Sequence, residues 1–73
     1  MDGRNLYGRV LKMLENCPEE IHLDALKDKI RIFIGASNQT VINTLQLMGN
    51  MKLIEERSDK PFYYKITRPE NGT

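Results

Sequence analysis

The sequence predicts a small α+β domain in which three helices precede a two-stranded β-hairpin. Apolar residues recur at three- and four-residue spacing through the first two thirds of the chain, which is typical of amphipathic helices. The last third changes to alternation with branched and aromatic residues, as strands do. The length of 73 residues suits one domain, 1–73, and we expect an ordered core at about 5–67 and a loose tail at 68–73.

The first two helices are bounded by proline and by a polar capping residue. Spacing of apolar residues predicts the first helix over about 4–17, and Pro18 then ends it. The second helix is expected over about 23–34, with His22 as its N-cap. Ile21, just before that cap, is a candidate for a short third strand at the edge of the hairpin.

A third helix is expected to begin after a turn at residues 35–37. Gly35 is expected to take the left-handed turn conformation, and Ser37 to cap the new helix through its hydroxyl. The helix ends either at Gly49 or one turn later near Met51, and the sequence leaves both ends open. Its predicted buried stripe is Val41, Leu45 and Met48.

The hairpin is predicted from two short segments, 52–57 and 62–67, joined by the turn-forming residues 58–61. Side chains of a strand point alternately to its two faces, so one face of the second segment is expected to pack against the helices and the other to face water. The residues expected to face the helices are Phe62, Tyr64 and Ile66.

Charge is distributed unevenly although the net charge is only +1. No acidic residue occurs between Asp28 and Glu55, whereas that interval holds Lys29, Arg31 and Lys52. A polyanionic partner is therefore expected to bind the middle third of the chain.

Several classes of protein are not expected. The longest apolar run, 32–34, is far shorter than the roughly 18 to 20 residues of a membrane span, so we expect a soluble, cytoplasmic protein without a membrane partner. Cys17 and His22 are the only residues of their types, which predicts no disulfide and no metal site. We find no phosphate-binding loop and no catalytic triad, and we expect no cofactor, no small-molecule ligand and no enzymatic activity.

Residues 30–45 resemble the core of the helix-turn-helix superfamily. The shared pattern is apolar residues, a glycine turn at Gly35, a capping Ser37, the pair Thr40-Val41 and then Leu45. The continuation through 53–55 and 64–67 resembles the winged branch, and the resemblance covers about residues 5–67. Two departures are a longer second helix and Lys52, which stands where the family usually has glycine.

The resemblance implies sequence-specific binding of double-stranded DNA by a small transcriptional regulator. A recognition helix at about 38–50 would enter the major groove, and a wing at 57–61 would lie on the backbone or minor groove. Expected base contacts are Gln39, Asn43, Gln46 and Asn50. Expected phosphate contacts are Lys29, Arg31, Ser37, Asn38, Thr40, Arg57, Lys60, Lys65 and Arg68.

Each expectation has a plainer alternative. The amides would simply solvate an exposed helix, and the cations would pair with neighbouring carboxylates at Asp28, Glu55, Glu56 or Asp59.

The recognition helix contains no lysine or arginine, so one copy would bind DNA weakly, and a homodimer would compensate by combining two sets of contacts. Candidates for covering a dimer interface are Tyr7, Ile32, Ile42 and Leu47, which would otherwise widen the core. The rival function is a protein-protein interaction module or a terminal domain of a replication complex.

Overall fold

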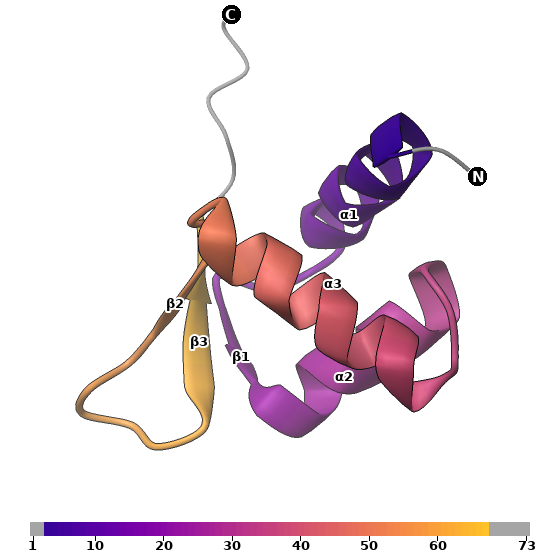
Figure 1. Cartoon of the computed structure of the whole chain (residues 1–73). Coiled ribbons are helices and arrows are strands. Elements are labelled where there is room, and N and C mark those ends of the chain that lie inside the picture. Colours follow the sequence, from indigo (N-terminus) through magenta and orange to yellow (C-terminus); the bar gives the residue numbers. More distant parts are fainter. Residues whose placement is uncertain (1–2, 68–73) are drawn as a thin grey trace, which may run out of the picture.

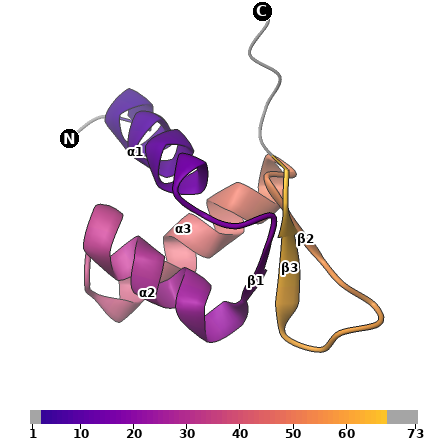
Figure 2. The same cartoon turned by 180° about the vertical axis from the view of Figure 1, so that it is seen from behind.

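The computed structural model describes residues 3–67, which form three helices and a three-stranded antiparallel sheet. The elements in chain order are α1 (Gly3–Glu15), β1 (Glu20–His22), α2 (Leu23–Phe33), α3 (Asn38–Asn50), β2 (Ile54–Glu56) and β3 (Tyr63–Ile66). The views in Figure 1 and Figure 2 both place the helices together and the β2–β3 loop pointing away from them. The expected α+β class is confirmed, and the expected tail at 68–73 lies outside the described residues.

The sheet has the order β1-β3-β2, so β3 is its central strand. Ile21 of β1 pairs with Tyr64 of β3, and its side chain is buried. On the other edge, Ile54 of β2 pairs with Ile66. The short third strand expected at Ile21 is therefore confirmed. It pairs with the hairpin and leads directly into α2.

A single hydrophobic core joins the helices to the sheet. Its buried members are Val10, Met13, Leu14, Cys17, Ile21, Leu26, Ile30, Val41, Met48, Leu53 and Ile66. Thr44 is buried with them, and its hydroxyl donates to the Thr40 carbonyl at 2.7 Å, which satisfies the polar group. Of the predicted buried stripe, Val41 and Met48 are buried, whereas Leu45 is half-buried and packs against the core.

The ends of the first two helices follow local hydrogen bonds. His22 is the N-cap of α2, and its Nδ1 accepts from the backbone N–H of Asp24 at 3.1 Å, as expected. The helix α1 ends at Glu15, two residues before the expected end at Cys17. The reason is that the next two backbone N–H groups donate to carbonyls three residues earlier, which tightens the chain into a 3₁₀-like turn.

The turn between α2 and α3 differs from the expectation. Gly35 does not have a positive φ, so the prediction of a left-handed glycine was wrong. The N–H groups of Ile34 and Gly35 both donate to the Ile30 carbonyl, at 2.7 and 3.0 Å, and this closes the helix without a left-handed residue. A Cβ atom at Gly35 would lie 3.1 Å from Cγ2 of Thr40. Glycine is thus favoured here by limited space.

The left-handed residue that closes a helix is Lys52, with φ 60°. Its N–H donates to the Gly49 carbonyl at 3.1 Å, and the N–H of Leu53 donates to the Met48 carbonyl at 2.8 Å. These two bonds form a Schellman motif at the end of α3, in which the left-handed position favours glycine. The departure noted in the sequence therefore falls on a residue with a strained backbone.

Phe62 is the second left-handed residue, with φ 67°. The prediction that it faces the helices was wrong, because its side chain is 62% exposed. A left-handed φ takes the residue out of the strand geometry that makes side chains alternate. Its carbonyl accepts from the N–H of Leu23 at 2.7 Å, so its backbone is bound to α2 while its ring faces solvent.

Candidate nucleic-acid interface

The exposed side of α3 carries a row of amide side chains, here called the amide stripe. Its members are Gln39, Asn43, Gln46 and Asn50, and all are exposed. The helix continues to Asn50 and has Met51 as its C-cap, so the alternative end at Gly49 does not apply. The amide stripe is therefore a continuous feature of one helix.

Two members of the amide stripe are hydrogen-bonded to each other. Nε2 of Gln39 donates to Oδ1 of Asn43 at 3.0 Å, across one helical turn. A primary amide has two donor hydrogens and two acceptor lone pairs, so this bond uses only part of the capacity of each group. The carbonyl of Gln39 and the NH₂ group of Asn43 keep donor and acceptor positions for a further partner.

The amino terminus of α3 is held by two hydroxyl groups. Ser37 accepts from the N–H of Thr40 at 3.1 Å, and its hydroxyl donates to Oγ1 of Thr40 at 2.8 Å. Ser37 is the N-cap, as expected from the sequence. The side chain of Asn38 is exposed. The first backbone hydrogen bond of the helix runs from the N–H of Val41 to the carbonyl of Ser37, so the N–H groups before Val41 have no backbone partner within the helix. Anions are favoured at such an end.

The two expected phosphate contacts on α2 have different surroundings. Nη1 of Arg31 lies 3.2 Å from Oδ1 of Asp28, so this cation is paired within its own helix. Lys29 is half-buried, and its side chain has no hydrogen bond or ion pair with another residue of 3–67. Of the two residues, only Lys29 therefore has a charge that no ion pair compensates in the part of the chain described.

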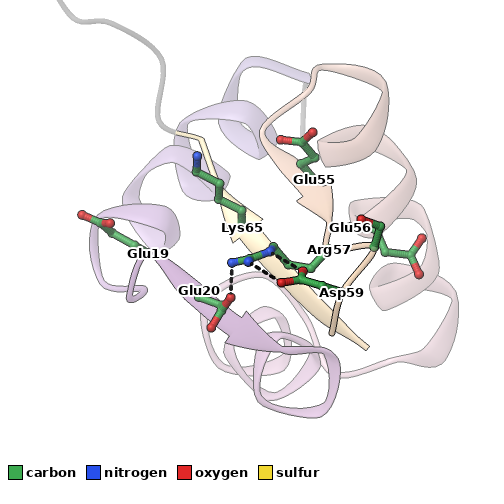
Figure 3. A pocket seen from close by; sticks show the side chains of 8 residues that line it. Glu19, Glu20, Glu55, Glu56, Arg57, Asp59 and Lys65 are labelled. Carbon is green, nitrogen blue, oxygen red and sulfur yellow. Dashed lines mark hydrogen bonds and ion pairs between the residues drawn. The ribbon is translucent and has the colours of Figure 1, made fainter. Parts of the chain in front are cut away.

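The cations of the wing are paired with carboxylates, as Figure 3 illustrates for Arg57. Arg57 binds Asp59 through two hydrogen bonds, of 3.1 and 3.0 Å, and it also contacts Glu20 of β1. Nζ of Lys60 lies 2.9 Å from Oε1 of Glu20. The hydrogen bond from Arg57 lowers the pKa of Asp59 below its ordinary value, and the same contact raises the pKa of Arg57.

The outer face of the sheet is acidic around these pairs. An open pocket of about 600 Å³ lies there, lined by Glu19, Glu20, Glu55, Glu56, Arg57, Ser58, Asp59 and Lys65. Lys65 of β3 stands in register between Glu20 of β1 and Glu55 of β2, so it too is flanked by carboxylates. Five carboxylates against two cations give this face a negative balance, which disfavours a polyanion.

Sequence reasoning missed the role of Glu20, which was not among the carboxylates expected to pair with the cations. The pairing of Glu20 with the wing depends on the β1–β3 register, and no local pattern indicates it. Arg68, an expected phosphate contact, lies outside the described residues. The remaining expected residues lie in two separate groups, one along α3 and α2 and the other on the outer face of the sheet.

The residues considered for a dimer interface also fall into two groups. Tyr7 and Leu47 pack against the core, in agreement with the alternative that they widen it. Ile32 is 76% exposed and Ile42 is 50% exposed, so that alternative does not hold for them.

No helix within residues 3–67 combines the length and apolar character needed to cross a bilayer. In the same part of the chain, no group of three or more His, Cys, Asp or Glu residues is arranged to hold a metal ion. Comparison with protein-family models, with curated proteins and with solved structures finds no match to this chain. The site residues themselves are therefore the basis for inferring a function.

Proposed function

We propose that this protein binds double-stranded DNA in a sequence-specific manner, with α3 in the major groove, and acts as a small transcriptional regulator by occupying its site. The observation that carries the proposal is the amide stripe, which is exposed along the whole of α3. An amide can donate to and accept from one adenine edge at once, and a good pair is worth roughly 1 to 3 kcal/mol of discrimination.

The charge around α3 supports the same orientation. No acidic residue lies between Asp28 and Glu55, so a phosphate backbone beside α3 meets no carboxylate from this segment. The amino terminus of α3 and the uncompensated Lys29 are the expected phosphate contacts on this side. The winged helix-turn-helix resemblance supports the proposal as well.

The wing contributes less in this proposal than the sequence alone suggests. The charges of Arg57 and Lys60 are compensated by Glu20 and Asp59, so few counterions would be released on binding there. One copy would therefore bind weakly at physiological salt. A homodimer would combine two sets of contacts, and the exposed Ile32 is a candidate for its interface.

One observation favours the rival function, an interaction module for another protein or for a replication complex. Phe62 is 62% exposed with a left-handed backbone, and Ile32 is 76% exposed. Large apolar side chains that are exposed to solvent suit a protein partner.

A salt-dependent titration separates the two functions. Labelled duplexes from a random pool are titrated at about 50 and 200 mM salt, and the retained duplexes are sequenced. We expect binding that weakens steeply with salt, and a variant carrying Gln39→Ala and Asn43→Ala should lose sequence preference more than overall affinity. Absence of binding at the lower salt concentration contradicts the proposal and favours the rival. Both replaced side chains are exposed, so loss of folding is not expected to confuse the result.

A further inference from the structure

Ile42 is an apolar residue on the exposed side of α3. Its side chain is 50% exposed, and the residues of α3 that are buried instead are Val41, Thr44 and Met48. At about 100° per residue, Ile42 lies about 60° from Gln39 and about 40° from Gln46 around the helix axis. Ile42 therefore adjoins the amide stripe on the surface proposed to face DNA.

Single exposed isoleucines are ordinary, so the position of Ile42 matters more than its exposure. The other large exposed apolar side chains among residues 3–67 are Ile32, Met51 and Phe62, and each lies outside α3. Isoleucine is also stiff in a helix, where one χ1 rotamer dominates. Ile42 thus presents a rigid apolar group at one edge of the amide stripe.

The composition of α3 restricts what this surface can read. Its sequence, NQTVINTLQLMGN, contains no lysine or arginine, which are the usual partners of the guanine edge. It also contains no aspartate or glutamate to accept from cytosine. The exposed side chains of α3 are amides, which match adenine, and one apolar side chain, which matches the 5-methyl group of thymine.

We infer that Ile42 contacts a thymine 5-methyl group in the major groove, and that the protein selects A·T base pairs through Ile42 together with the amides beside it. The inference rests on the proposed function. It identifies the chemistry of the DNA site and assigns Ile42 to specificity instead of to a dimer interface.

Replacing thymine by deoxyuridine tests the contact, because it removes one methyl group and leaves base pairing unchanged. The probe is the duplex most enriched from a random pool by the wild-type protein, synthesised with deoxyuridine at one thymine at a time. We expect that pool to yield A·T base pairs, and one substitution to weaken wild-type binding by about fourfold, the effect of burying one methyl group. In Ile42→Ala that substitution should have no effect. In the matched control Ile32→Ala the fourfold effect should remain.

Any one of the following results overturns the inference. An equal dependence on the methyl group in wild type and Ile42→Ala excludes the contact. Enrichment of G·C base pairs excludes the selected chemistry. A change from dimer to monomer in Ile42→Ala by sedimentation, without altered discrimination of thymine from deoxyuridine, assigns Ile42 to an interface. If no duplex is retained at about 50 mM salt, the proposed function fails too, whereas binding with no methyl dependence overturns the inference alone.

Discussion

Glu20 of β1 and Lys60 of the wing form an ion pair with 2.9 Å between Oε1 and Nζ, although they are 40 residues apart in the sequence. Arg57 contacts the same carboxylate. Glu20 thus compensates two of the cations that the sequence assigns to phosphate binding. The charge that the wing can offer to DNA depends on Glu20 and, for Arg57, on Asp59 as well.

Replacing Glu20 by Gln should release Lys60 from its ion pair and leave Arg57 paired with Asp59 alone. We expect tighter duplex binding and a steeper salt dependence, because each added phosphate contact increases the logarithmic slope by about 0.9. The ion pairs are partly exposed, so stability should change little. Duplex titration at several salt concentrations measures the slope, and Glu19→Gln is the matched control because it removes the same charge without releasing Arg57 or Lys60. Equal slopes in the two variants would show that the wing does not approach DNA.

Gly35→Ala should destabilise the protein. The added Cβ would meet Cγ2 of Thr40 at 3.1 Å, and Thr40 is held by its hydrogen bonds to Ser37. Overpacking of this kind costs 1 kcal/mol or more, and reduced freedom of the unfolded chain offsets part of that cost, so we expect a net loss of about 1 kcal/mol in urea unfolding. Gly49→Ala, where nothing lies within 4 Å, should stabilise the protein by about 0.5 to 1 kcal/mol. Stabilisation by both variants would mean that the turn has room for a methyl group.

Lys52→Gly should stabilise the protein by about 1 kcal/mol. Glycine adopts the left-handed conformation without the steric cost that lysine bears at φ 60°. Lys52→Ala separates the two effects, since it removes the charge and keeps the backbone strain. Thermal unfolding should therefore give a higher Tm for the glycine variant and an almost unchanged Tm for the alanine variant. Equal shifts would assign the effect to the charge.

The contact between Arg57 and Asp59 should be visible in the acid titration of Asp59. Its pKa lies below the ordinary value because Arg57 donates two hydrogen bonds to the carboxylate. A lowered pKa in the folded state means that this contact stabilises the protein above about pH 4 and ceases to do so as the pH falls through the lowered value. Carbon-detected NMR should show a higher midpoint in Arg57→Gln and no change in Lys65→Gln. An unchanged midpoint in Arg57→Gln would exclude the contact.

Those features that depend on nearby residues were predictable from the sequence. His22 and Ser37 cap their helices through bonds to residues two and three positions on, and the apolar spacing identified most of the core. Ile21 was also predictable as a third strand, because an apolar residue beside a hairpin gains burial by pairing with it. Local chemistry was sufficient for the two helix caps.

The rest depends on contacts between distant segments. The left-handed backbone of Phe62 accompanies a bond to Leu23, which removes Phe62 from the alternation that the strand suggested. The pairing of Glu20 with Arg57 depends on strand register. Within the candidate site, the amide stripe was therefore predictable in position, whereas the compensation of the wing cations was not.

In the proposed function, the amide stripe of α3 contacts DNA. Titrating a nitrogen-labelled sample with a duplex enriched from a random pool, and following the side-chain NH₂ signals, tests it directly. We predict that the largest shifts belong to Gln39, Asn43 and Gln46, with the backbone signals of the α3 amino terminus next. Shifts confined to the outer face of the sheet, or no shifts at about 50 mM salt, would contradict the claim.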